Sequence, residues 1–202
     1  MIDNHFRKIL PQYTDRLIAT YQQLGLTPNQ ITLLGLPVAM LAAFFVSLEW
    51  NLLAIATWWL GRLLDGTDGI YARATGQTSP FGAYLDIVCD MAAYSFMIFG
   101  FYLAYPDHTL MWLVILFFYV LCIASALALG NLEQESSIAA ADNRGLRLGA
   151  GLAEAGETGI AYTIFLLAPT WIGFWGWLWI LILIVTIVAR TMLARQVLQV
   201  KI

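Results

Sequence analysis

Charged residues are scarce in this chain. Asp, Glu, Lys and Arg make up only 11% of its 202 residues, whereas ordinary globular proteins contain about 25%. Hydrophobic residues make up 60%, and the mean hydropathy is +0.74. So few polar side chains cannot cover the apolar surface of a water-soluble fold. The composition therefore predicts an integral membrane protein.

Basic residues and cysteines are also few. The formal net charge is −3, which leaves no basic stripe to neutralise phosphates, so nucleic acid is not expected as a partner. The two cysteines, Cys89 and Cys122, both lie in apolar stretches. This placement predicts buried free thiols and excludes a disulfide framework.

Long apolar segments, in contrast, are abundant. A helix needs about 20 mostly apolar residues to cross a membrane, and polar or proline-containing breaks separate six segments of this kind. We predict an all-α integral membrane fold in which residues 1–202 form a single domain, with a six-helix bundle over residues 30–196. The predicted spans are residues 30–49, 52–75, 80–105, 109–132, 156–172 and 174–196.

Residues 5–24 show a different pattern. Apolar residues recur there near helical spacing, with charged residues between them. This pattern predicts an N-terminal amphipathic helix that lies in the membrane interface. The alternative is a soluble cap on the first span.

The basic residues are placed unevenly along the predicted spans. With six spans, both termini lie on one side of the membrane. All ten Lys and Arg residues fall on that side or at span ends that face it. Because positive residues are enriched on the cytoplasmic side, we predict a multi-pass protein of the plasma (inner) membrane with both termini in the cytoplasm.

Four aspartates in the second and third predicted spans form the most informative pattern. Asp65 and Asp68 are three residues apart and share one helix face, and Asp86 and Asp90 are four apart and share another. The short turn at residues 76–79 makes these helices antiparallel neighbours. The four carboxylates are therefore expected to converge near the cytoplasmic end of the pair.

Clustered carboxylates need compensating positive charge. Pairing with Arg62 and Arg73 is one possibility, but two arginines cannot neutralise four carboxylates. Divalent cations are the simpler solution. Oxygen ligands without nearby His or Cys suit Mg²⁺, Mn²⁺ or Ca²⁺, and two bound ions are a common arrangement for displacement at phosphorus.

Small residues and one arginine surround the aspartates. Gly66, Gly69, Ala72 and Gly82 open space in which a ligand can approach the backbone, and Arg73 is a natural phosphate partner. Two alternatives stay open. The small residues can serve tight helix packing alone, and Arg73 can anchor the span at the cytoplasmic surface.

These residues together resemble the signature of the CDP-alcohol phosphotransferase family, D-x2-D-G-x2-A-R-x8-G-x3-D-x3-D. The segment Thr27–Thr32 also resembles one that this family often carries before its first span. The chain matches the signature at every fixed position, namely Asp65, Asp68, Gly69, Ala72, Arg73, Gly82, Asp86 and Asp90.

The resemblance implies an activity and a set of metal ligands. Members transfer a substituted phosphate, here expected to be phosphatidyl from CDP-diacylglycerol, to an alcohol acceptor and release CMP. Asp65, Asp68 and Asp86 would bind Mg²⁺ or Mn²⁺, with two ions expected. Asp90 would act as a ligand, as the catalytic base, or as both. The active site would face the cytoplasm.

The resemblance also implies how the substrates bind. Gly69, Ala72, Arg73 and Gly82 would line the pocket for the CDP moiety, and Asn29 would join them. A homodimer is expected. The acceptor alcohol is undefined: Arg144 and Arg147 can receive a phosphorylated acceptor, or they can serve only as topology anchors.

Two other functions compete with this interpretation. A membrane prenyltransferase also uses aspartate-bound Mg²⁺ on a diphosphate, but it needs two separate Asp-rich motifs and a longer chain. A divalent-cation transporter can use clustered carboxylates as its binding site. That function does not explain Arg73 or the glycines, nor the position of the acids near one face of the membrane.

Overall fold

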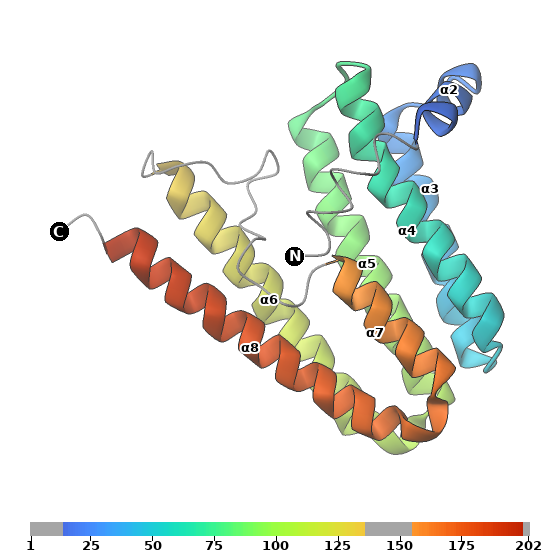
Figure 1. The fold of residues 1–202 in the computed structure, drawn as a ribbon, viewed down its shortest axis with the longest axis vertical. Helices are drawn as coiled ribbons and strands as arrows, with labels where there is room; N and C mark the ends of the chain where they lie inside the picture. Colours follow the sequence, from blue (N-terminus) through green and yellow to red (C-terminus); the bar gives the residue numbers. More distant parts are fainter. Residues whose placement is uncertain (1–13, 136–154, 200–202) are drawn as a thin grey trace. The chain divides into compact units, whose positions relative to one another are not determined.

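The structure, a computed structural model, describes residues 14–135 and 155–199. The regular elements in these ranges are all helical (Figure 1). They form two compact units, one that ends at Asp107 and one that begins at His108. The helices of the first unit are α2 (Asp15–Gln23), α3 (Pro28–Ser47), α4 (Asn51–Ala74) and α5 (Pro80–Ala104). The 3-10 turn η1 (Pro106–His108) then leads to α6 (Thr109–Glu135), α7 (Ala155–Leu167), the 3-10 turn η2 (Pro169–Trp171) and α8 (Ile172–Gln199).

In the first unit, α3 packs closely against both α4 and α5 (Figure 1). Gly100 makes the close approach of α5 to α3 possible, because a Cβ there would collide with the Ala43 backbone. Between α3 and α4, a Cβ at Gly61 would meet the Gly35 carbonyl oxygen at an ordinary contact distance of 3.6 Å. Small residues let helices in membranes come together in this way. The sequence predicted that α4 and α5 are neighbours, and the structure adds α3 as the helix that joins them.

The start of α3 is fixed by its own sequence. Thr27 accepts a hydrogen bond from the Gln30 backbone, and the Gln30 side chain accepts one from the Thr27 backbone. This reciprocal pair satisfies two backbone donors at the helix start. Pro28 occupies the first turn, where a missing N–H costs nothing. The cap therefore sets where Asn29 and Thr32 lie.

The start of α5 follows the same logic. The Ser79 side chain accepts a hydrogen bond from the Gly82 backbone N–H at 3.0 Å, and Pro80 occupies the first turn. Gly76, with a φ of 67°, lies in the turn that separates α4 from α5. A positive φ is a conformation that glycine adopts without steric cost. The turn places the end of α4 near the start of α5.

Helix α2 is tied to the rest of its unit by Tyr21. The Tyr21 side chain is 5% exposed and packs with Ile31 and Tyr71. Its hydroxyl forms a 3.0 Å hydrogen bond with the Thr67 hydroxyl of α4. The described part of the predicted 5–24 segment is therefore helical and packed against the protein. Its location in a membrane interface stays a prediction.

In the second unit, α6 runs along α8, and α7 contacts α8 near the turn that joins them (Figure 1). The hydroxyl of Tyr119 links all three helices. It shares a 2.9 Å hydrogen bond with the Tyr162 hydroxyl of α7 and accepts one at 3.0 Å from the Trp179 indole of α8. These bonds satisfy polar groups in an apolar environment, where an unmade hydrogen bond is costly.

Four helices are long and apolar enough to cross a membrane: Pro28–Ser47, Pro80–Ala104, Pro106–Leu132 and Pro169–Leu198. The prediction of membrane helices is thus confirmed for four of the six segments. Helix α4, with 24 residues, is also long enough to cross a membrane, but it contains the charged residues of the aspartate pattern and is not among these four apolar helices. Helix α7 has 13 residues and spans about 20 Å, less than the roughly 30 Å hydrocarbon core.

The fifth predicted span, 156–172, is interrupted. Helix α7 ends at Leu167, and Pro169 begins η2. A residue before proline is disfavoured in the helical region, and Ala168 has φ −129° and ψ 59°. The chain then turns directly into α8 at Ile172. The helix therefore ends before the predicted end of the span at residue 172.

Two of the basic residues in the described part of the chain lie inside the protein. The Arg62 side chain is 8% exposed, and Arg190 is 2% exposed. Arg190 donates hydrogen bonds from α8 to the Cys122 carbonyl and the Ser125 hydroxyl of α6, at 2.6 and 3.0 Å. Arg62 contacts the aspartates described below. These two arginines therefore stabilise contacts between helices, and they do not count as surface charges that set the membrane orientation.

Candidate functional site

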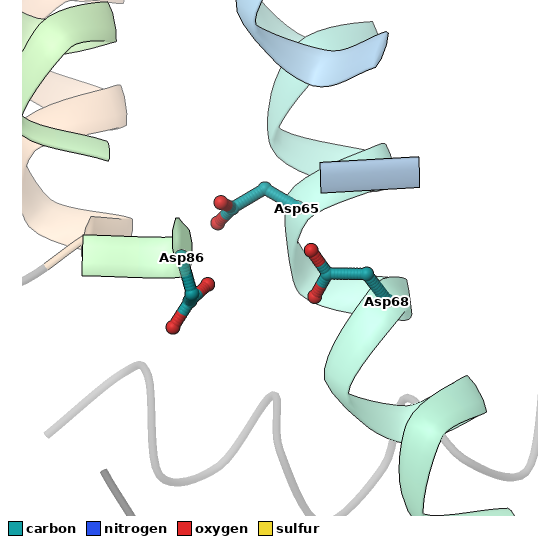
Figure 2. A group of neighbouring side chains, drawn as sticks. All are labelled: Asp65, Asp68 and Asp86. Carbon is teal, nitrogen blue, oxygen red and sulfur yellow. The ribbon is translucent and has the colours of Figure 1, made fainter. Parts of the chain in front are cut away.

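Three of the four predicted aspartates converge. Asp65 and Asp68 extend from α4, and Asp86 extends from α5 towards the same space (Figure 2). One carboxylate oxygen of each lies within 4.8 Å of the others. Asp68 and Asp86 are buried, and Asp65 is half-buried. The spacing argument from the sequence therefore placed these three side chains correctly.

Asp68 is held by two hydrogen bonds to its two carboxylate oxygens. The Thr32 hydroxyl of α3 donates to Oδ2, and the Gly69 backbone N–H donates to Oδ1 at 2.5 Å. A carboxylate held at both oxygens keeps one orientation. Hydrogen bonds of this kind commonly orient metal ligands. Thr32 therefore belongs to the site, because it connects α3 to one of the converging aspartates.

Asp90, the fourth aspartate, is paired with an arginine. Arg62 Nη1 lies 2.5 Å from Asp90 Oδ1 and 3.4 Å from Asp65 Oδ2. Asp90 is thus beside the three-aspartate cluster but contacts it through Arg62. Arg62, which with Arg73 was considered as a charge partner of the aspartates, therefore compensates part of the negative charge. The two hydrogen bonds to Asp68 do not involve Arg62.

Asn29 and Gly82 lie close together where α3 and α5 begin. A Cβ at Gly82 would be 3.0 Å from Asn29 Oδ1 and 3.2 Å from Ser79 Oγ. Contacts that short require a neighbour to move, so glycine keeps this place open. The two helix N-termini also carry positive partial charge, which favours an anionic group. The structure therefore brings together two residues that the resemblance assigned to the CDP pocket.

Arg73 and Gly69 form a second such pair, on α4. Arg73 is exposed, and its Nη1 atom would lie 3.3 Å from a Cβ at Gly69. The Arg73 guanidinium thus lies over Gly69, the residue that directly follows Asp68. Ala72 is buried on the same helix. Arg144 and Arg147 lie outside the described residues.

The three converging aspartates suit a divalent cation. Carboxylate oxygens are the ligands that Mg²⁺ and Mn²⁺ prefer. Three acidic side chains within 4.8 Å would repel one another strongly without a cation between them. Asp68 is already oriented by Thr32 and Gly69, as a preformed ligand would be. The donor set therefore fits an oxygen-coordinated divalent ion.

Sequence reasoning did not assign two contributors to the site. Thr32 was noted only as part of a family-like segment, and Arg62 only as a possible charge partner. The feature that indicates Thr32 is its place just after the capped start of α3, from which its hydroxyl reaches Asp68. The signal for Arg62 is its spacing, three residues before Asp65 on the same face.

The acidic cluster between α4 and α5 defines a candidate metal site in a helical membrane protein. Comparison with known proteins defines the class further. The sequence profile of the CDP-alcohol phosphatidyltransferase family matches residues 25–188. The chain belongs to this family, and the predicted family and enzyme class are confirmed.

Curated relatives agree with this assignment. The chain is 34% identical over 180 residues to the inner membrane protein YnjF of Escherichia coli, covering 85% of this chain and 84% of that protein. It is 37% identical over 94 residues to the archaetidylinositol phosphate synthase of Pyrococcus horikoshii, covering 46% of this chain and 50% of that one.

Solved structures share the fold. The phosphatidylinositol phosphate synthase of Mycobacterium tuberculosis with CDP-DAG bound has a TM-score of 0.68 at 21% identity, covering 91% of this chain and 94% of that chain. The same enzyme in complex with manganese and citrate has a TM-score of 0.67 at 21% identity, covering 90% and 88%. The helical arrangement described above is thus one that a CDP-DAG-binding enzyme also uses.

Proposed function

We propose that this protein transfers the phosphatidyl group of CDP-diacylglycerol to a polar alcohol and releases CMP. The observation that carries the proposal is the convergence of Asp65, Asp68 and Asp86 beside the paired helix starts at Asn29 and Gly82. An acidic cluster next to an open, positively polarised end of two helices suits a metal-bound diphosphate. The CDP-DAG-bound relative supports the choice of donor.

Asp65, Asp68 and Asp86 would hold two ions of Mg²⁺ or Mn²⁺, with Asp90 as a further ligand. A divalent ion bound there would neutralise charge on the diphosphate and on the departing CMP. Thr32 and the Gly69 N–H would keep Asp68 in position as a ligand. The manganese complex of the structural relative supports this choice of ion.

The CDP moiety would lie against the glycine and alanine positions. Gly82 and Gly69 leave room for its diphosphate near the backbone, and Ala72 keeps the adjacent part of α4 small. Arg73 would donate hydrogen bonds to a phosphate. Asn29, whose side chain lies next to Gly82, would contact the same phosphate. Each of these groups binds or orients the donor.

Asp90 would act as the general base. It would take the proton of the acceptor hydroxyl as that oxygen forms a bond to the distal phosphorus. The phosphorus–oxygen bond to CMP breaks in the same step, and CMP leaves with the bridging oxygen. Because Arg62 engages Asp90 Oδ1, the proton would go to Oδ2.

The remaining features of the proposal concern the acceptor and the assembly. Arg144 and Arg147 would receive a phosphorylated acceptor. The chain would form one membrane domain with six spans and an interfacial N-terminal helix, and two copies would form a homodimer. Both termini and the site would face the cytoplasm. Reactivity of a cysteine introduced at position 8 or at position 107 towards an impermeant thiol reagent distinguishes the two sides.

The test uses detergent-solubilised full-length protein with CDP-diacylglycerol, Mg²⁺ or Mn²⁺, and a panel of alcohols that includes glycerol phosphate and inositol phosphate. We expect CMP release with one acceptor, a matching phospholipid by mass spectrometry, and loss of both on adding a chelator. Asp90→Asn should release no CMP while still binding the donor. Absence of CMP with every acceptor, together with metal flux in liposomes, would support a transporter instead.

A further inference from the structure

Arg62 is the buried cation of the acidic site and is not among the fixed positions of the family signature. It lies on α4, and its side chain is 8% exposed. Its Nη1 atom is 2.5 Å from Asp90 Oδ1, 3.2 Å from the Tyr94 hydroxyl and 3.4 Å from Asp65 Oδ2. It thus links the proposed base on α5 to a proposed metal ligand on α4.

The three contacts of Nη1 are not equal. This nitrogen carries two hydrogens, so it cannot make three full hydrogen bonds. The contact with Asp90 is the shortest, and Tyr94 and Asp65 share the remaining donor capacity at longer distances. Asp90 is therefore the main partner of Arg62.

Two aromatic rings hold the guanidinium in place. Its carbon lies 4.8 Å from the centroid of the Trp58 ring, one turn earlier on α4, and 5.2 Å from that of Tyr94 on α5. The two rings are themselves in contact, with centroids 6.0 Å apart. A planar guanidinium packs against aromatic faces, so its orientation is set by its neighbours and not by the aspartates alone.

We propose that Arg62 is a positioning residue for Asp90. It holds Oδ1 and turns Oδ2 towards the acceptor hydroxyl, whose proton Oδ2 receives as the new bond to phosphorus forms and the bond to CMP breaks. The catalytic part of this inference rests on the proposed function of Asp90. The contact between Arg62 and Asp90 does not.

The alternative is that Arg62 only supplies positive charge to the cluster. Arg62→Lys separates the two roles. Lysine keeps the charge, but its compact ammonium cannot reproduce the planar donor geometry of the guanidinium beside the Trp58 and Tyr94 rings. A charge-only role predicts that Arg62→Lys behaves like the wild type. A positioning role predicts that it does not.

The first experiment needs no activity. The thermal unfolding midpoints of Arg62→Met, Asp90→Asn and the double variant are measured in detergent with chelator present, and the exposed Arg16→Lys serves as control. Arg62→Met should lower the midpoint by about 5 °C or more, because it leaves the half-buried Asp90 carboxylate without its partner. Adding Asp90→Asn should restore about half of that loss. If the midpoint changes of Arg62→Met and Asp90→Asn simply add in the double variant, Asp90 is not the main partner of Arg62.

The second experiment measures CMP release at saturating metal. We expect Arg62→Lys to lower kcat roughly tenfold to a hundredfold, with KM for CDP-diacylglycerol changed about threefold or less. The Mn²⁺ affinity, read by electron paramagnetic resonance, should stay near that of the wild type. A wild-type kcat in Arg62→Lys, or a loss that follows Mn²⁺ affinity, would overturn the proposal.

The two failures can be told apart. If the wild-type protein releases no CMP with any acceptor, the proposed function is wrong, and the unfolding measurements still test whether Arg62 holds Asp90. If the wild type is active and Arg62→Lys is equally active, the positioning role is wrong and the proposed function stands.

Discussion

The hydroxyl of Thr32 on α3 donates a hydrogen bond to the carboxylate of Asp68 on α4. The same hydroxyl lies 3.2 Å from the Pro28 carbonyl of its own helix. One O–H cannot donate fully to both, and a carboxylate is the stronger acceptor. The start of α3 is thereby coupled to a candidate metal ligand that is 36 residues away in the sequence.

Thr32→Val tests this coupling. Valine keeps the shape but removes the donor, so Asp68 loses a bond that fixes its orientation. We expect the apparent Mn²⁺ affinity to fall about 10- to 100-fold, as is typical for groups that orient metal ligands. Thr57→Val is the matched control, because in the described part of the chain the Thr57 hydroxyl bonds only carbonyls of its own helix. Equal affinity in both variants would contradict the role of Thr32.

Gly82→Ala tests the open space at the start of α5. The added methyl group would lie 3.0 Å from Asn29 Oδ1 and would push the amide away. We expect KM for CDP-diacylglycerol to rise about tenfold with the fold retained, because substrate positioning tolerates little displacement. Gly35→Ala is the control, since its methyl group would meet neighbours at ordinary contact distances of 3.7 Å or more. A larger effect from the control would show that helix packing, not donor binding, is at issue.

Asp86→Asn tests the metal site from the α5 side. The substitution removes one of the three converging carboxylates and leaves a side chain of the same size. We expect Mn²⁺ binding by isothermal titration calorimetry to weaken by about tenfold or more, because the ion prefers charged oxygen ligands. Asp107→Asn, an exposed aspartate in η1, should bind like the wild type. Unchanged binding in Asp86→Asn would remove this residue from the ligand set.

Ionisation of Tyr21 is expected to lower the stability of the first unit at alkaline pH. Burial raises the pKa of the Tyr21 phenol above its ordinary value of 10.0, against a smaller opposite effect of its bond to Thr67. A raised pKa in the folded protein means that this group stabilises the fold below about pH 10 and that the stabilisation is lost as the pH rises further. Tyr21→Phe should therefore flatten the decline in unfolding midpoint between about pH 9 and pH 11.

At neutral pH the same variant should cost only about 1 kcal/mol, the net worth of an ordinary hydrogen bond. Thr67 keeps its bonds to the Leu63 and Leu64 carbonyls, at 2.7 and 3.0 Å, so its hydroxyl is not left unsatisfied. A steep alkaline decline that persists in Tyr21→Phe would assign the effect to another group, such as Tyr105, whose pKa burial also raises.

Tyr119→Phe tests the hydrogen-bonded centre of the second unit. It removes the acceptor of the Trp179 indole and the partner of the Tyr162 hydroxyl. We expect a loss of about 1–3 kcal/mol of stability, because the Trp179 indole N–H loses its acceptor. Donor KM should not change if the proposed donor site lies entirely in the first unit. Phe118→Leu, a substitution beside it on α6, is the control for packing.

The pattern of aspartates was predictable because it depends on local spacing. Residues three and four apart share a helix face, and the short turn at Gly76 brings the two faces to the same end of the bundle. The sequence also indicated the family, since every fixed position of its signature is present. The convergence of Asp65, Asp68 and Asp86 needed no further information.

The contributions of Thr32 and Arg62 were not predictable at the same level. Each depends on the packing of separate helices: Thr32 faces Asp68 because α3 lies against α4, and Arg62 reaches Asp90 across to α5. The periodicity of one helix does not determine the rotation of the next. The early end of α7 was missed for a different reason, because apolar residues continue past Leu167 although Pro169 stops the helix.

All residues of the proposed donor and metal site, from Asn29 to Asp90, lie in the unit that ends at Asp107. The two arginines proposed for the acceptor come later in the chain. Donor chemistry and acceptor choice would then be encoded in consecutive stretches of the gene. A single crossover near codon 107 between two family members could exchange the head group of the lipid product and preserve the machinery that handles the nucleotide.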